Sequence, residues 1–205
     1  VGCGKTVVAL HAIVMACGSG YQAALMAPTE VLSEQHYLSL SPMFETLGVQ
    51  GRLLKGGQTG RERTEILAGI QSGQVQVVVG THALLQPDVH FARLGLVIVD
   101  EQHKFGVLQR AQLRAKAAWH PDVLVMTATP IPRTLAMTLY GDLDVSVIDQ
   151  FPPGKKPVKT LLFPAGHRKE AHRLMRKELE SGRQAYVVYP LVEPSEKIDL
   201  QAAIE

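Results

Sequence analysis

L-G-L-V-I-V-D-E-Q-H-K-F-G, residues 94–106, is the stretch that decides the fold. Five of the six positions from Leu94 to Val99 are apolar without alternation, which is typical of a parallel strand buried on both faces. The run stops at Asp100 and Glu101, so two carboxylates stand at the carboxyl end of a core strand, the edge where open α/β sheets bind ligands. One carboxylate there can hold Mg²⁺, and its neighbour can orient water or accept its proton. A strand that merely ends in solvated acids is the alternative for D-E alone.

A second motif, V-G-C-G-K-T, opens the chain and leads into an apolar helical run that ends near Gly18. It matches the second half of the phosphate-binding pattern G-x-x-x-x-G-K-[ST], whose first glycine is absent here. Its glycines let backbone N–H groups approach phosphate, its lysine adds positive charge, and its threonine hydroxyl can bind Mg²⁺. By itself the motif also fits a Gly-rich turn into an ordinary helix. Because an apolar strand ending in D-E follows roughly a hundred residues later, the pair predicts a site for a nucleoside triphosphate and Mg²⁺. The predicted nucleotide-binding residues are Gly2, Cys3, Gly4, Lys5 and Thr6, and the predicted metal ligands are Thr6 and one carboxylate of the D-E pair.

Length and composition restrict the class of protein and the kinds of binding site that the chain can have. Its 205 residues are 46% hydrophobic and carry a net charge of +2, so any site for a polyanion must be a local patch. No apolar run reaches the roughly 18 residues of a membrane span and no signal peptide is visible, which predicts a soluble protein. The 2 cysteines fit a reducing, cytoplasmic setting, and apart from His103 the 8 histidines are interpreted as surface or packing residues. Because Val1 stands within a motif, we expect the sequence to be a piece of a longer polypeptide.

Strands and helices alternate over residues 1–150, which predicts a parallel sheet in a three-layer sandwich. Strands are expected at residues 22–26, 49–54, 75–79, 94–99, 123–126 and 145–148. Further helices are expected at residues 31–40, with Thr29 as N-cap and Pro42 breaking or kinking the chain beyond it, and after a capping box at residues 59–62. The last two are expected at residues 109–118, with Arg110, Arg114 and Lys116 on a solvated face, and at residues 132–140.

A linker is predicted at residues 151–157, F-P-P-G-K-K-P, where the composition shifts to proline and glycine. Residues 1–150 form one expected domain. Residues 158–205 begin a second, with a strand at 158–163, a charged amphipathic helix at 168–180 and a strand at 184–188. This β-α-β unit is left unfinished.

Several motifs stand in the order and approximate spacing found in superfamily 2 helicases: G-x-G-K-T, A-P-T-E, G-T-H-A-L-L, D-E-Q-H and T-A-T-P. Within that superfamily, D-E-Q-H-K-F-G-V-x-Q-R and M-T-A-T-P-I-P-R-T-L-A-M-T resemble the RecG family of branched-DNA helicases, as do D-L-D-V-S-V-I-D and G-R-Q-A-Y. The transcription-repair coupling factor is a close runner-up, since it shares D-E-x-H-R-F-G-V and T-A-T-P-I-P-R-T-L. The resemblance implies a three-layer αβα RecA-like P-loop NTPase lobe followed by the start of a second such lobe.

The resemblance also implies roles for the residues around the acidic pair. Asp100 would hold Mg²⁺ through water, and Glu101 would orient or deprotonate the attacking water. Gln102 and His103 would sense the γ-phosphate and bond to the hydroxyls of T-A-T, coupling hydrolysis to the DNA-facing surface. The coupling residues are Thr127, Ala128 and Thr129, for which simple turn formation is the alternative.

A DNA path is implied along two short polar loops, whose hydroxyl and N–H groups can contact phosphates without reading sequence. The implied DNA-binding residues are Pro28, Thr29, Glu30, Gly80, Thr81, His82 and Arg133. For residues 80–82 an ordinary strand-to-helix turn is the alternative.

The function implied is an ATP-dependent DNA helicase or translocase, monomeric and cytoplasmic, that acts on stalled forks and Holliday junctions in recombination and repair. A double-strand DNA translocase that displaces RNA polymerase and a nucleotide-binding switch without unwinding are the alternatives. Because the resemblance puts the catalytic arginines in later motifs, and an arginine finger is worth roughly 10³ to 10⁵ in rate, we expect this fragment alone to hydrolyse ATP poorly.

Overall fold

The computed structural model describes residues 2–58, 60–101, 116, 120–128, 144–150, 152–154 and 158–188. The chain divides into two compact units, Val1–Lys155 and Lys156–Glu205, and each is described by itself. Of the two helices predicted at residues 109–118 and 132–140, only Lys116 falls among the described residues.

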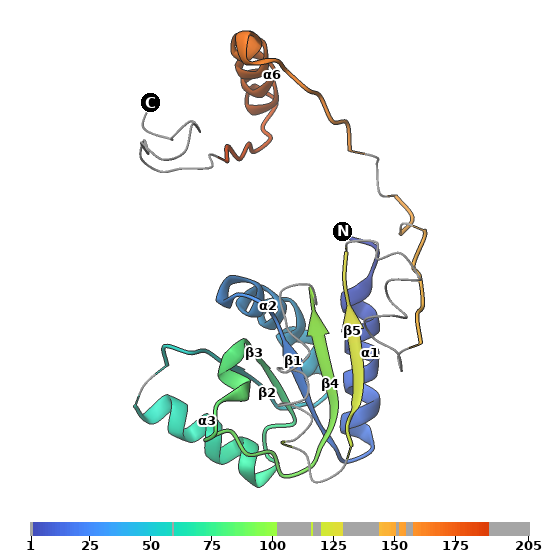
Figure 1. Cartoon of the computed structure of the whole chain (residues 1–205), viewed down its shortest axis with the longest axis vertical. Coiled ribbons are helices and arrows are strands. Elements are labelled where there is room, and N and C mark those ends of the chain that lie inside the picture. The colour runs from blue at the N-terminus through green and yellow to red at the C-terminus, as the bar shows by residue number, and fades with distance from the viewer. Residues whose placement is uncertain are drawn as a thin grey trace. The chain divides into compact units, whose positions relative to one another are not determined.

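Five parallel strands form the sheet of the first unit, in the order β2-β3-β1-β4-β5 (Figure 1). The strands are β1 Gln22–Met26, β2 Gly51–Leu54, β3 Val77–Gly80, β4 Leu94–Asp100 and β5 Asp122–Met126. The helices between them are α1 Lys5–Gly18, α2 Glu30–Thr46, α3 Arg61–Ser72 and the 3₁₀ turn η1 His82–Leu85. Parallel neighbours require crossover connections, and α2 and α3 provide them.

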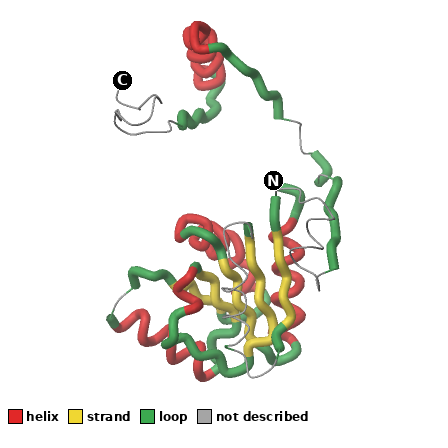
Figure 2. Tube along the Cα trace, in the orientation of Figure 1, coloured by secondary structure: helices red, strands yellow, loops and turns green. Residues whose placement is uncertain are grey.

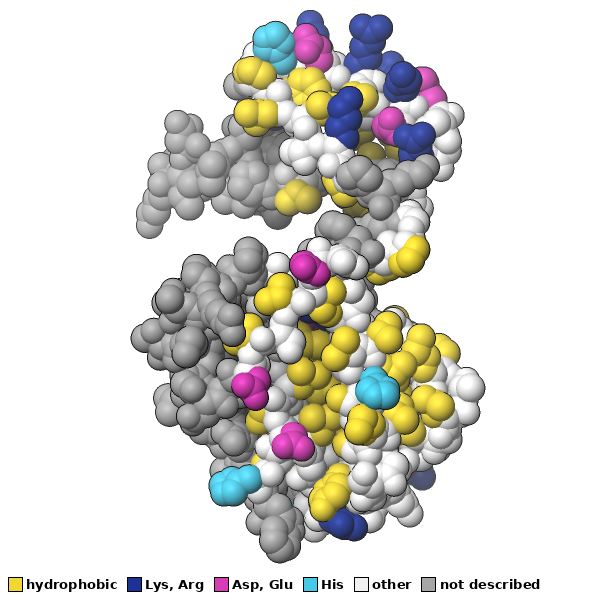
Figure 3. All heavy atoms as spheres, turned by 90° about the vertical axis from the view of Figure 1, so that its right-hand side faces the viewer, with side chains coloured by type: hydrophobic (Ala, Val, Ile, Leu, Met, Phe, Trp, Pro, Cys, Tyr) yellow, Lys and Arg dark blue, Asp and Glu magenta, His cyan; other side chains and the backbone are white. Residues whose placement is uncertain are grey.

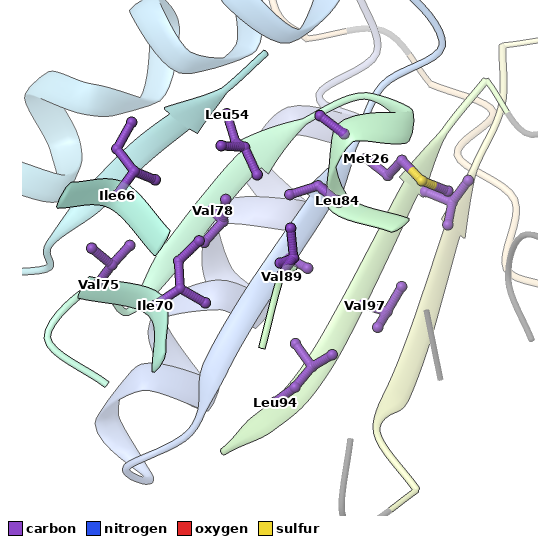
Figure 4. Close-up of a cluster of buried hydrophobic side chains, with 13 residues drawn as sticks. Met26, Leu54, Ile66, Ile70, Val75, Val78, Leu84, Val89, Leu94 and Val97 are labelled. Carbon is purple, nitrogen blue, oxygen red and sulfur yellow. The ribbon is translucent and has the colours of Figure 1, made fainter. Parts of the chain in front are cut away.

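Helices cover both faces of the sheet, which gives three layers (Figure 2). On one face Ile13 of α1 and Phe44 of α2 pack with Leu25 and Ile98. On the other face Ile66 and Ile70 of α3 and Leu84 of η1 pack against strand side chains that alternate with those (Figure 4). These strand side chains include Met26, Leu54, Val78, Val97 and Val99. Because both faces are buried, the strands read as continuous apolar runs. The prediction of a three-layer fold around a parallel sheet is confirmed.

The helix predicted at residues 31–40 is longer than expected, because α2 runs through Pro42 to Thr46. Proline lacks an N–H and usually ends a helix. Here Pro42 lies on the exposed side, while Leu40 and Phe44, each 1% exposed, hold the helix against the sheet before and after it. Core packing therefore outweighs one lost backbone hydrogen bond on the solvent side.

The capping box predicted at residues 59–62 is wrong. The N-cap of α3 is Gly60, with φ 74° and no side-chain cap bond, and Glu62 accepts from Gln58 Nε2 at 3.2 Å. Glycine reaches this positive φ without strain, so the chain enters the helix without a hydroxyl cap. At the other end Gly73 follows the helix with φ 79°.

Three predicted strands, at residues 145–148, 158–163 and 184–188, are not formed. Most of their side chains are exposed to solvent; Val147 is 80% and Leu162 95% exposed. A strand needs a hydrogen-bonded neighbour, and apolar alternation alone does not provide one. In the second unit the described elements are the 3₁₀ turn η3 Ala165–His167 and α6 Arg168–Glu180, and α6 has the bounds that the sequence predicted.

The helix α1 is apolar on more than its buried side. Val7 is 65% and Met15 62% exposed, while Ala9 and Ile13 on the opposite side are fully buried. Figure 3 shows hydrophobic side chains gathered on this flank of the first unit. Among the described residues, none of the helices has both the length and the apolar character that crossing a bilayer requires.

Candidate nucleotide site at the carboxyl edge of the sheet

The turn before α1 has the backbone of an anion-binding loop. Gly2 has φ 72°, and Gly4, the N-cap, has φ 97° and ψ 11°. Only glycine adopts these angles readily. Within this described turn the helix start has no side-chain cap bond and no acidic residue. The first N–H groups of the helix and its dipole can therefore interact with phosphate.

The topology places Lys5 at the same edge of the sheet as Asp100. A tight turn joins α1 to β1, with Tyr21 N–H bonded to the carbonyl of Ala16 at 3.0 Å, so the helix and the strand run in opposite directions. Since α1 rises about 21 Å and β1 about 17 Å, the start of α1 reaches the carboxyl end of β1. Because β4 is parallel to β1, its last residue, Asp100, lies at that edge too, and Figure 1 shows the N-terminus on this side.

Asp100 is 8% exposed, and its two carboxylate oxygens differ in their surroundings. Oδ2 lies 2.7 Å from Nε2 of His36, whereas Oδ1 is buried and has no hydrogen-bond partner in the described part of the chain. A buried carboxylate oxygen without a partner is costly, and a hydrated Mg²⁺ is a group that would satisfy it. The donor set thus fits the predicted metal, with Thr6 on the same edge as a second oxygen ligand.

Glu101 has an unusual backbone, with φ 52°. The left-handed region costs a non-glycine residue roughly 1–2 kcal/mol, and such residues cluster at functional sites. Glu101 comes directly after the last residue of β4, at the ligand edge of the sheet. Because its backbone is left-handed, its side chain does not continue the alternation of side chains along the strand.

The predicted coupling residues begin at the same edge of the sheet as Glu101. Asp100 pairs with Met126, the last residue of β5, so Glu101 and Thr127 come directly after the ends of adjacent strands. Of the other predicted residues here, Ala128 is described, whereas Gln102, His103, Thr129 and Arg133 lie outside the described residues.

The two predicted DNA-contacting loops follow adjacent strands, β1 and β3, at this edge. Pro28 and Glu30 flank Thr29, which is the N-cap of α2 as predicted, with its Oγ1 accepting from Leu32 N–H at 3.3 Å. In the second loop His82 is exposed. Gly80 and Thr81 are both buried, so the side chain of Thr81 belongs to the packing and not to the surface.

His36 was missed as a site residue, because it was interpreted as a surface or packing histidine. It lies on the sheet-facing side of α2, in register with Ser33 and Leu40, both buried. The spacing i, i+3, i+7 was visible in the sequence. Since α2 follows β1, its first turns had to lie at the ligand edge.

Lys116 was predicted on a solvated helix face, and that prediction is wrong. Its Nζ donates to the carbonyls of Gln86 at 2.6 Å and Val89 at 3.0 Å. Partial burial lowers the pKa of Lys116. The same segment is held by Arg63, which donates to Asp88 at 2.8 Å and lowers the pKa of that carboxyl. The segment after η1 is thus fixed from two sides.

Comparison with known proteins identifies this architecture. The family model of the DEAD/DEAH box helicases matches residues 1–138, and the chain belongs to that family. Its first unit is a RecA-like helicase lobe, as the sequence predicted.

Within the family the chain resembles RecG. It is 55% identical to the ATP-dependent DNA helicase RecG of Synechocystis over 205 residues, which is 100% of this chain and 24% of that protein. It is 51% identical to RecG of Escherichia coli O157:H7 over 207 residues, covering 99% of this chain and 30% of that protein. A solved structure of RecG bound to a three-way DNA junction superposes with a TM-score of 0.76 at 47% identity, covering 93% of this chain and 25% of the other. The predicted resemblance is confirmed, and the chain spans about a quarter of the length of these relatives.

Proposed function

We propose that this chain is the motor portion of an ATP-dependent DNA helicase of RecG type, acting on branched DNA in recombination and repair. The single observation that carries the proposal is the shared edge: the glycine turn before Lys5 and the acidic end of β4 lie at the carboxyl edge of one parallel sheet. Parallel α/β sheets bind their ligands there.

In the proposed site the N–H groups at the start of α1, together with Lys5, bind the phosphates of ATP. Thr6 and Asp100 hold Mg²⁺, which would neutralise charge that develops on the phosphates during transfer. Glu101 orients the attacking water and accepts its proton, while Gln102 and His103 respond to the γ-phosphate. The buried, unpartnered Oδ1 of Asp100 supports the metal assignment.

We propose that single-stranded DNA crosses the same edge over the loops after β1 and β3. The loop after β1 presents the hydroxyl of exposed Thr29, the loop after β3 presents the imidazole of exposed His82, and the two strands are adjacent. Contacts of this kind bind phosphate without reading bases, as a translocating motor requires. Thr127, Ala128 and Thr129 would relay the nucleotide state to this surface, since Thr127 follows the strand that pairs with β4. Arg133 would add a phosphate contact.

The domain assignment is part of the proposal. Residues 1–150 would be the first motor lobe, residues 151–157 the linker, and residues 158–205 the beginning of a second lobe whose strands form only with their sheet neighbours. The division of the chain near Lys155 supports this boundary. Both cysteines are free thiols, which supports the proposed cytoplasmic setting.

The decisive experiment measures ATP hydrolysis and strand separation by the complete protein, at the length of its relatives, on forked and on plain duplex DNA. We expect stimulation by the fork and unwinding of it. Glu101→Gln, which keeps the size of the side chain but removes the base, should bind ATP and fail to turn it over. Equal stimulation by plain duplex would favour a double-strand translocase, and no stimulation by DNA would favour a nucleotide switch.

A further inference from the structure

A histidine from α2 reaches the carboxylate that ends β4. Nε2 of His36 lies 2.7 Å from Oδ2 of Asp100, and both side chains are mostly buried, at 15% and 11% exposed. At this distance the contact is a short, charge-assisted hydrogen bond, about twice as strong as a neutral one. It joins residues 64 positions apart in the sequence.

The chemistry of the pair fixes the direction of the bond. An ionised carboxylate can only accept hydrogen bonds, so Nε2 of His36 carries the proton and donates it. Oδ2 of Asp100 is then occupied. Oδ1, buried and without a partner in the described part of the chain, is the oxygen left for another ligand.

The element that carries His36 is held firmly. Thr29 caps the start of α2, and Ser33 Oγ donates to the carbonyl of Glu30 at 2.8 Å. Beyond His36 the helix is fixed by Tyr37, whose hydroxyl donates to the carbonyl of Gly51 at 3.4 Å, and by buried Leu40. The imidazole is therefore presented to Asp100 from a rigid support, which is what orientation of a ligand group requires.

We propose that His36 is a positioning residue for the metal site. By donating to Oδ2 it fixes the rotation of the Asp100 carboxylate and directs Oδ1 toward the cation that accompanies the nucleotide. The inference rests on the proposed function, because it assigns His36 to the same Mg·ATP site. Groups that orient a metal-binding carboxylate typically change metal affinity 10- to 100-fold when they are removed.

The test measures metal affinity in place of turnover. Mn²⁺, a spectroscopic substitute for Mg²⁺, is titrated into the complete protein with saturating ADP and followed by electron paramagnetic resonance. His36→Leu removes the donor and should weaken Mn²⁺ binding about tenfold or more. His36→Gln places an amide nitrogen near the position of Nε2 and should stay within about threefold of the original protein. His36→Asn, whose amide is too short to reach Oδ2, should behave like His36→Leu. His11→Leu, an exposed change on α1, is the matched control.

A second measurement separates positioning from packing. ADP affinity without metal, followed with a fluorescent ADP analogue, should be unchanged in all His36 variants. In an Asp100→Asn background His36→Leu should have no further effect on Mn²⁺ binding, because the group that it positions has been altered. If His36→Leu unfolds the protein, the comparison of Gln with Asn still decides the matter.

Three outcomes overturn the inference: unchanged Mn²⁺ affinity in His36→Leu, equal losses in His36→Gln and His36→Asn, or an equal loss of metal-free ADP binding. Failure of the proposed function gives a different result, since the unaltered protein would then bind neither ADP nor Mn²⁺ in an ADP-dependent way.

Discussion

The side-chain nitrogen of Gln22 lies 2.7 Å from the carbonyl oxygen of Val75, inside the amino edge of the sheet. The same nitrogen donates to the carbonyl of Ile70 at 2.9 Å, and Oε1 accepts from the N–H of Arg93 at 2.9 Å. The side-chain amide of Gln22, a residue that is 3% exposed, thus connects the start of β1 by hydrogen bonds to three segments. These are the end of α3, the residues before β3 and the residues before β4.

Replacing Gln22 with Met should destabilise the lobe by about 3 kcal/mol, because the carbonyl of Val75 and the N–H of Arg93 lose their partner and each such loss costs about 1–3 kcal/mol before relaxation. The carbonyl of Ile70 keeps its bond from Gly73 N–H at 3.1 Å. Urea unfolding measures the effect as a lower midpoint with an unchanged slope. Gln74→Met, at an exposed position, is the control and should change stability by less than about 0.5 kcal/mol. Equal midpoints for the two variants would contradict the bridging role.

Gly80 is a packing requirement at the ligand edge. A Cβ built on it would lie 2.6 Å from the carbonyl oxygen of Leu54 and 3.1 Å from Cγ of Leu84. Since Leu54 pairs with Gly80 across β2 and β3, its carbonyl cannot withdraw without breaking the pairing. Gly80→Ala should therefore lower stability by about 2 kcal/mol in urea unfolding, within the range for overpacked cores.

The control for that change is Gly18→Ala. Gly18 is the last residue of α1, with nothing within 4 Å of its built Cβ, so alanine there should be neutral or stabilise by up to about 1 kcal/mol. If the Gly80→Ala protein were as stable as the Gly18→Ala protein, β2 and β3 would be able to move apart enough to accommodate the added methyl group, which would contradict the packing requirement.

The first unit could be read from the sequence because local pattern and tertiary environment agree there. Residues 94–99 are apolar without alternation, and β4 is buried on both faces. The strands predicted at residues 145–148 and 158–163 failed because strand formation depends on a neighbour that apolar pattern does not specify. Pro42 was misjudged for a related reason, since Leu40 and Phe44 override a local helix breaker.

The candidate site was predictable in its motifs but not in its contacts. Lys5 and Asp100 were assigned to one edge from motif logic, and the parallel pairing of β1 with β4 gives the geometry. The contact between His36 and Asp100 depends on which face of α2 meets the sheet, and the left-handed turn at Glu101 has no sequence signature. Both follow from tertiary packing.

The thiol of Cys17 makes stability depend on alkaline pH. Burial raises the pKa of Cys17 to about 11, above that of the unfolded chain. Between the two values the unfolded thiol ionises while the folded one stays protonated, so the stability present below about pH 9 is lost as pH rises toward 11, by at most about 1.4 kcal/mol per pH unit. Unfolding free energies of the original protein and of Cys17→Ala, measured from pH 8 to 11, should converge as pH rises. A constant difference across that range would contradict the assignment.

Cys3 offers a direct probe of nucleotide binding. It lies half-buried in the glycine turn before α1, whereas Cys17 is buried in the core. A small maleimide should label Cys3 in the native protein and Cys17 only after unfolding. Mg·ATP should slow labelling of Cys3 at least tenfold, as read from the peptide that contains Cys3 by mass spectrometry, since bound phosphates would cover the turn. Equal labelling rates with and without saturating Mg·ATP would place the nucleotide elsewhere.

Thr29 combines a structural role with a proposed DNA contact, and two substitutions separate them. Thr29→Ala removes the bond from Oγ1 to Leu32 N–H and should cost about 1 kcal/mol of stability. Thr29→Asp keeps an N-cap acceptor and adds a negative charge favourable to the helix dipole, so stability should stay within about 0.5 kcal/mol. The same charge repels DNA phosphate, so affinity for single-stranded DNA should fall about tenfold, and more at low salt, where charge repulsion is less screened.

The measurements that separate the two roles are urea unfolding for stability and fluorescence anisotropy with a labelled oligonucleotide for DNA. Thr29→Ser keeps both the cap and the hydroxyl and is the matched control for each. The predicted pattern is a stable Thr29→Asp protein with weak DNA binding beside a less stable Thr29→Ala protein whose DNA binding is weakened less, because it loses one hydroxyl contact without gaining a repelling charge. Unimpaired DNA binding by Thr29→Asp at low salt would remove the loop after β1 from the DNA path, and would leave Thr29 with its role as the cap of α2.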